Sequence, residues 1–148
     1  MERRRVGAPL AVHVFAAYMG LATAMAEDKA QVATVTQPAL VLAKRSGRGA
    51  SLSEHIVVRV IGFRPAQEGA VQVVVKAVVN GAKQEVGRFG IFPNAPFKSE
   101  AQEQAQMFSL TLPKELANVE TLALQFSIQP FRGTGTGAEV EIGGAEIE

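Results

Sequence analysis

Hydrophobic and polar residues alternate along most of this chain from residue 55 onward, with the two-residue period of half-buried β-strands. The clearest case runs from Val71 to Val79, where every second residue is Val or Ala and Gln72 and Lys76 lie between them. Asn80-Gly81 follows at once, and this dipeptide favours a two-residue hairpin turn because both positions tolerate positive φ. The pattern predicts a hairpin whose return strand covers residues 83–92.

The last thirty residues predict two further strands. Residues 121–129 alternate strictly, and a glycine- and threonine-rich turn leads into a second alternating stretch. Within that stretch Val140 and Ile142 share one parity, whereas Ala145 and Ile147 share the other. A strand changes parity without turning its core face to water only if it contains an extra residue. We therefore predict a β-bulge at Gly143-Gly144.

Strands are also predicted over residues 55–63 and 108–112, and a single helical turn over residues 114–117. Residues 93–106 form the one long polar insertion, in which Ser99 and Gln102 match a helix-capping pattern for a short helix over residues 99–105. Short strands separated by turn residues, with almost no helix, indicate an all-β fold. We predict an antiparallel β-sandwich of six to seven strands with one long polar loop.

The N-terminal segment has the pattern of a secretory signal peptide. Arg3, Arg4 and Arg5 precede an uncharged, alanine-rich stretch that ends in Ala24-Met25-Ala26, a small-residue cleavage site. A retained membrane anchor is the alternative interpretation. We expect residues 1–26 to be cleaved, residues 27–52 to form an extended lead-in with at most one edge strand, and residues 53–148 to form the sandwich. The mature chain would be periplasmic or extracellular, with no membrane contact.

Composition and charge exclude several functions. The full chain has 15 basic and 14 acidic residues; Arg3, Arg4, Arg5 and Glu2 lie in the signal, which leaves 12 and 13. A nearly neutral chain without a clustered basic face is not typical of nucleic-acid binding. Cysteine is absent, so the chain has no thiol nucleophile, thiolate metal site or disulfide.

Candidate chemistry is sparse. His55 is the one histidine outside the signal, and one histidine does not make a metal or catalytic centre. Paired carboxylates could serve glycoside hydrolysis, but Glu139, Glu141 and Glu146 alternate with apolar residues, the pattern of a solvated sheet face. We expect no catalytic residue, metal site or cofactor.

Aromatic residues border the polar insertion. Phe92, Pro93, Asn94 and Phe97 are candidate contacts for a partner protein, because exposed aromatic side chains dominate binding hot spots. In the alternative interpretation Phe89 fills the core while Phe92 and Phe97 pin the loop.

Three stretches, in order, resemble the C-terminal domain of plant polyphenol oxidases. Residues 73–80, Val-Val-Val-Lys-Ala-Val-Val-Asn, resemble that domain's Val-Lys-Phe-Asp-Val-Tyr-Val-Asn strand, although Ala77 and Val78 replace Phe-Asp. Residues 85–94 resemble its next strand, which carries Gly-x-Phe; Asn94 stands where that strand ends in His. The third stretch, residues 110–132 followed by residues 140–148, is similar to its closing strands, which run Val-x-Leu-Val-Pro-Arg and then Val-x-Ile-Gly-Gly-x-x-Ile-Glu. Pro130-Phe131-Arg132 inserts one residue into the Pro-Arg pair.

The resemblance implies a β-sandwich that shields the dicopper site of a type-3 copper oxidase acting on phenols and catechols. The copper-binding histidines of that family lie in a helical catalytic domain, and this sequence contains no such domain. The chain would then be a non-catalytic accessory domain that docks on a separate tyrosinase- or catechol oxidase-like enzyme, with Phe92 or Phe97 plugging the substrate position. The alternative is an exported structural or protein-binding β-sandwich unrelated to copper oxidases. A copper carrier is disfavoured, because His55 and Met107 are too few ligands.

Overall fold

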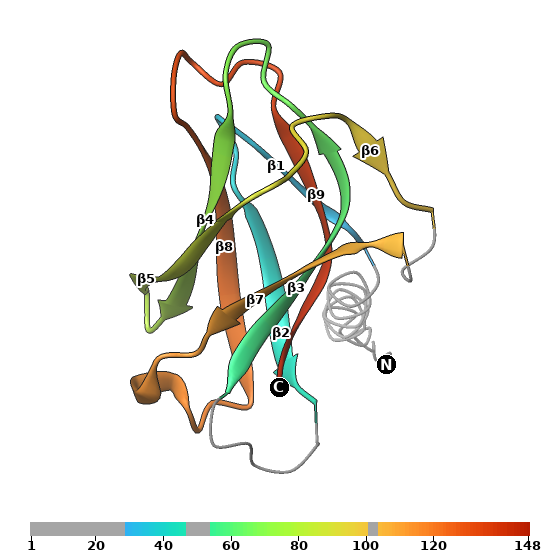
Figure 1. The fold of residues 1–148 in the computed structure, drawn as a ribbon. Helices are drawn as coiled ribbons and strands as arrows, with labels where there is room; N and C mark the ends of the chain where they lie inside the picture. The colour runs from blue at the N-terminus through green and yellow to red at the C-terminus, as the bar shows by residue number, and fades with distance from the viewer. Residues whose placement is uncertain (1–28, 47–53, 101–103) are drawn as a thin grey trace, which may run out of the picture.

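The computed structural model describes residues 29–46, 54–100 and 104–148, and the predicted signal peptide lies outside them. The described chain is almost entirely β-structure (Figure 1). Its elements are β1 (Gln31–Thr34), β2 (Ala39–Arg45), β3 (His55–Arg64), β4 (Val71–Val79), β5 (Ala82–Gly90), β6 (Phe97–Lys98), β7 (Gln106–Thr111), the single turn η2 (Lys114–Leu116), β8 (Thr121–Pro130) and β9 (Glu139–Ile147). The predicted all-β class is confirmed.

The strands form one mixed sheet that folds back on itself into two layers. Its order is β5-β4-β8-β2-β9-β3-β6, with β1 also beside β9 and β7 beside β3. The layer β5-β4-β8-β2 faces the layer built on β9 and β3 (Figure 1). Two details differ from the prediction: the described chain has nine strands, and β2 pairs with β9 in parallel rather than antiparallel.

The segment expected to be a lead-in contributes two strands instead of one edge strand. β1 pairs with the first half of β9, and β2 lies between β8 and the last part of β9. Ala39 and Ala43 of β2 are buried in the core, at 3% and 0% exposure. The segment is therefore an integral part of the sheet, because β2 pairs with a strand on each side and contributes buried residues to the core.

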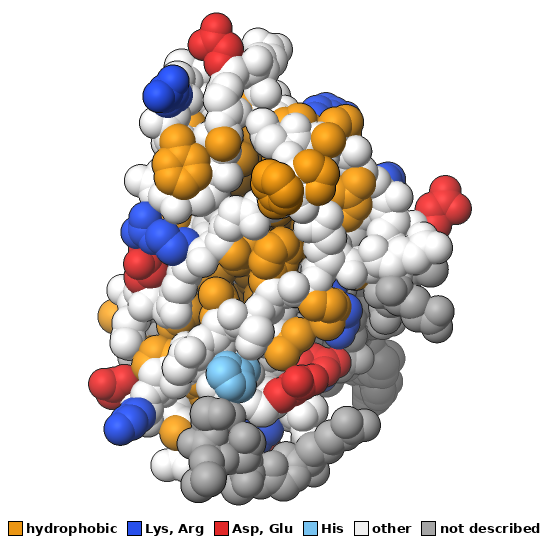
Figure 2. All heavy atoms as spheres, viewed as in Figure 1, with side chains coloured by type: hydrophobic (Ala, Val, Ile, Leu, Met, Phe, Trp, Pro, Cys, Tyr) orange, Lys and Arg blue, Asp and Glu red, His pale blue; other side chains and the backbone are white. Residues whose placement is uncertain are grey.

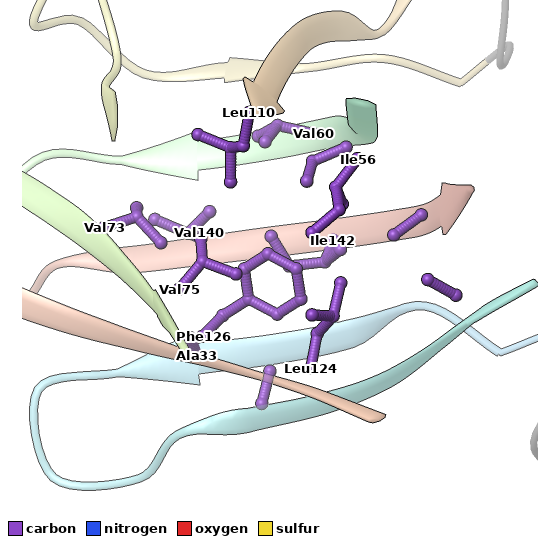
Figure 3. Close-up of a cluster of buried hydrophobic side chains, with 14 of the residues drawn as sticks. Ala33, Ile56, Val60, Val73, Val75, Leu110, Leu124, Phe126, Val140 and Ile142 are labelled. Carbon is purple, nitrogen blue, oxygen red and sulfur yellow. The ribbon is translucent and has the colours of Figure 1, made fainter. Parts of the chain in front are cut away.

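The core lies between the two layers and is made of the inward residues of the alternating strands. Figure 3 shows the Phe126 ring among Val75, Leu124, Val140 and Ile142, all of which are at most 1% exposed. Burying one such side chain contributes about 1.5–3 kcal/mol relative to leaving it in water. The packing of these rows, rather than any cross-link, holds the layers together.

The predicted hairpin and bulge are both present. Asn80 and Gly81 join β4 to β5 with φ values of 51° and 81°. Along β9, Arg59 of β3 pairs with Gly144 but Val60 pairs with Ile142, so Gly143 is the extra residue. Val140, Ile142, Ala145 and Ile147 are consequently all buried.

The bulge on β9 faces a second bulge on β3, which the sequence analysis did not foresee. Gly62 pairs with Glu141, so Ile61 has no partner on β9. A Cβ atom on Gly143 would lie 2.7 Å from the Ile61 Cγ2 atom. Glycine at this position therefore lets the two bulges lie against each other. The Ile61 carbonyl accepts a hydrogen bond from the backbone N–H of Ser99, at 2.7 Å.

The short helix predicted over residues 99–105 depends on residues 101–103, which lie outside the described residues. The predicted helical turn near residue 114 is present as η2. Arg45 holds this turn to the sheet: its guanidinium pairs with Glu54 and donates to the carbonyl oxygens of Ala117 and Val119.

Candidate functional site

The loop between β5 and β6 presents one fully projecting aromatic ring. Phe92 is 87% exposed, whereas its neighbour Ile91 is buried in the core. The Phe92–Pro93 peptide bond is cis, and Ala95 donates a backbone hydrogen bond to the Pro93 carbonyl at 2.8 Å. Phe92, Pro93 and Asn94 are all exposed. The loop thus exposes the apolar side chain of Phe92 to solvent, while the neighbouring Ile91 side chain is buried.

Phe97, the fourth candidate contact, occupies a different environment. It begins β6, pairs with Phe63 of β3 and packs against the hydrophobic core. Its side chain is only partly exposed. The structure therefore groups Phe92 with Pro93 and Asn94, and it separates them from Phe97, which anchors the far end of the same loop.

Phe89 lies where β5 of one layer and β7 of the other are close together without being hydrogen-bonded neighbours. β5 and β7 end the two halves of the sheet and are not neighbours in the strand order. The rings of Phe89 on β5 and Phe108 on β7 stack between these strands with centroids 4.2 Å apart. Figure 2 shows apolar side chains gathered along the middle of the face that carries β3, β5 and β7. Phe89 thus packs between the layers, next to the loop that carries Phe92.

A shallow groove of about 410 Å³ lies beside Phe97. Its lining residues come from β1, β3, β6 and β9 and from the residue before β6: Val32, Gly62, Phe63, Arg64, Pro96, Phe97, Lys98, Glu139 and Glu141. Glu141 leans over Gly62, where a Cβ atom would lie 2.7 Å from its Oε2 atom. Its carboxylate reaches within 3.8 Å of Lys98 Nζ. Sequence reasoning missed this groove, since its walls come from strands far apart in the chain; the one local signal is Gly62 within a Val- and Ile-rich strand.

The carboxylates of β9 are each matched by a cation on the same outer face. Arg64 lies 3.6 Å from Glu139, Lys98 lies 3.8 Å from Glu141, and Arg59 lies 3.4 Å from Glu146. We call these three pairs the charge ladder. They match the solvated face predicted for the β9 glutamates, although each carboxylate also has a cross-strand partner. Paired charges of this kind can bind a polar ligand but supply no activated nucleophile.

Within the described residues, no group of three or more His, Cys, Asp or Glu side chains is placed to hold a metal ion. His55 begins β3 and exchanges two backbone hydrogen bonds with Glu148, at 2.7 and 2.8 Å.

A search of the described residues for a helix of the length and apolarity needed to cross a membrane finds no candidate.

Comparison with known proteins gives structural likeness but no match in sequence. No family model and no curated protein matches this chain. Among solved structures, a latent aurone synthase (polyphenol oxidase) is similar with a TM-score of 0.47 and 14% identity, over 79% of this chain and 25% of that one. Latent apple tyrosinase is similar with a TM-score of 0.47 and 18% identity, over 78% of this chain and 28% of that one.

This chain therefore spans little more than a quarter of the length of those structures. The likeness concerns the fold of one part of each of them. The sequence resemblance to polyphenol oxidases is accompanied by a structural likeness to members of that group.

Proposed function

We propose that this chain is an exported, non-catalytic accessory domain that docks on a separate type-3 copper oxidase of the tyrosinase or catechol oxidase kind. The basis of the proposal is the three stretches of sequence resemblance, which lie in β4, in β5 and the loop after it, and in the segment from the end of β7 through β8 and β9. The copper would belong to the partner enzyme. This chain would act by covering the entrance to the partner's active site.

The observation that carries the proposal is the exposure of Phe92. An aromatic ring that is 87% exposed beside a buried residue is costly to leave in water, and such rings are typical anchors of protein interfaces. Ile91 on one side and Phe97 on the other hold the loop to the core. A loop fixed at both ends loses little conformational entropy on binding. Phe92 is therefore suited to fill an apolar pocket in a partner.

The test first asks whether an adjacent gene encodes a six-histidine copper oxidase that lacks its own C-terminal sandwich, and then mixes the purified mature chain with an oxidase of that kind. Catechol oxidation is measured, together with binding by co-purification. The wild-type chain should bind the oxidase and inhibit it. Phe92→Ala should weaken inhibition at least about tenfold, because truncation of an interface anchor costs about 2 kcal/mol or more.

The matched control is Phe131→Ala, which removes another exposed phenylalanine, 62% exposed, just after β8. This variant should inhibit like the wild type. If Phe92→Ala also inhibits like the wild type, Phe92 is not the plug. If the wild-type chain neither binds nor inhibits the oxidase, the accessory role is wrong and an exported β-sandwich unrelated to copper oxidases is the better description.

A further inference from the structure

The outer face of the layer β5-β4-β8-β2 carries an apolar strip with basic residues beside it. Leu40 and Leu42 on β2 are 62% and 46% exposed. The strand register places Leu42 opposite Ala123 of β8, and Ala123 opposite Val78 of β4. These residues alternate with the core residues of the same strands, so they share the outer face. We call this surface the leucine face.

The leucine face has an excess of positive charge. Lys76 lies in the same cross-strand row as Leu40, and Lys83 of β5 lies opposite Val78. The outward positions of β2, β8 and β4 contain no acidic residue: Leu40, Leu42, Lys44, Thr121, Ala123, Gln125, Ser127, Gln129, Gln72, Val74, Lys76 and Val78. On the outer face of β5, Glu85 is paired with Arg88 at 2.6 Å. The face thus carries Lys76, Lys83 and Arg88 against the carboxylate of Glu85, whereas Lys44, at its edge, lies opposite Glu146 of β9.

From the excess positive charge and the exposed apolar strip of the leucine face, we infer that this face binds a second protein. The surface of that protein presents carboxylates around an apolar strip of its own. Exposed leucines in a row mark an interaction surface when they adjoin one another. Lys76 and Lys83 favour a negatively charged partner, because opposite potentials meet across protein interfaces.

A protein fits this face better than a lipid surface does. Gln125 and Ser127 lie on the outer side of β8, and Gln125 is the direct neighbour of Leu40. Sinking the leucines into hydrocarbon would also bury these amide and hydroxyl groups without partners, which costs several kcal/mol each in an apolar medium. A protein surface can hydrogen-bond them while covering the leucines.

The leucine face is distinct from the loop that carries Phe92. Its leucines lie on β2, which is three strands away from β5 in the sheet order. The inference therefore does not rest on the proposed role toward a copper oxidase, and the two contacts can be tested separately.

The test places a photo-reactive side chain at single positions of the full chain in the organism that makes it. Leu42→p-benzoylphenylalanine samples the leucine face. Val32→p-benzoylphenylalanine is the matched control, since Val32 is also 46% exposed but lies on the outer face of the other layer. A third variant at Phe92 reports on the oxidase contact alone.

Illumination should crosslink position 42, but not position 32, to one acidic protein that mass spectrometry identifies. Lys76→Glu with Lys83→Glu should lower that yield roughly tenfold, because two favourable charge contacts become repulsive. Lys98→Glu, on the other layer, should leave the yield unchanged. Leu40→p-benzoylphenylalanine repeats the experiment at the more exposed position if the Leu42 variant does not fold.

The inference is overturned by any of four results. These are no protein adduct from positions 40 and 42, an adduct with lipid, an adduct with a second copy of this chain, or the same adduct from position 32. An adduct from position 92 with a copper oxidase, alongside no adduct from position 42, would support the proposed function while refuting the leucine face.

Discussion

The two outer faces of this molecule treat charge in opposite ways. On the layer built on β9 and β3, three cations face three carboxylates in the charge ladder. On the leucine face, three cations, Lys76, Lys83 and Arg88, meet the single carboxylate of Glu85, and two exposed leucines lie beside them. Both faces come from the same two-residue alternation. The alternation decides which side of a strand is buried. The chemistry of the outward residues decides whether a face has balanced charges or combines excess positive charge with exposed leucines.

The strongest test of this comparison contrasts the two sides of the layer that carries the leucine face. Leu124 is fully buried, and Leu42 is 46% exposed on the opposite side of the same layer. Leu124→Ala should lower the free energy of unfolding by about 2–5 kcal/mol, because it leaves a cavity. Leu42→Ala should change it by less than about 0.5 kcal/mol. Urea unfolding measures both, and a large loss for Leu42→Ala would mean that the leucine face is covered in the free chain.

The next test breaks the bulge that supports the charge ladder. Gly144 has a φ of 157°, and the Arg59 guanidinium lies where its Cβ atom would be. Gly144→Val should cost about 1–3 kcal/mol through backbone strain and should displace Arg59 from Glu146. Thermal unfolding gives the loss. Gly90→Ala is the control, because no heavy atom lies within 4 Å of the added methyl; an equal loss in both variants would contradict a specific role for the bulge.

The smallest effect is expected from the charge ladder itself. Made singly, Glu139→Gln, Glu141→Gln and Glu146→Gln should each lower the free energy of unfolding by less than about 1 kcal/mol, because each pair is partly solvated; a triple variant combines the three changes. The loss should shrink as salt is added. The triple variant also makes this face basic like the leucine face. If position 32 then crosslinks to the same acidic protein, charge alone attracts the partner and the leucines are dispensable.

Local sequence features, namely turn dipeptides and the alternation of apolar and polar residues, were enough to predict much of the fold. The Asn80-Gly81 turn and the Gly143-Gly144 bulge follow from backbone preferences and from a parity change that can be read directly in the sequence. The alternation predicted for residues 121–129 is likewise present in the burial of β8, where Leu122, Leu124, Phe126 and Ile128, at every second position, are all buried.

Strand pairing between distant segments was not predictable in the same way. Periodicity indicates that a strand is half-buried but not which strand lies beside it. The segment 27–52 was therefore expected to lie at an edge, although β2 lies between β8 and β9. The charge ladder and the groove beside Phe97 were missed for the same reason, since their members meet only after the sheet has formed. Phe92 and Phe97 could not be told apart, because both flank the same proline-rich turn.

The position of β9 sets the order in which the chain can complete its fold. β9 pairs with β1, β2 and β3 together, so Val32 meets Glu141 across almost the whole described sequence. Until residues 139–147 have been synthesised, three N-terminal strands lack the neighbour that joins them into one sheet. Such long-range closure is slow relative to local hairpin formation. The β4–β5 hairpin has no such dependence, because its two strands pair with each other across the Asn80-Gly81 turn, whereas the complete sheet forms only when residues 139–147 are available.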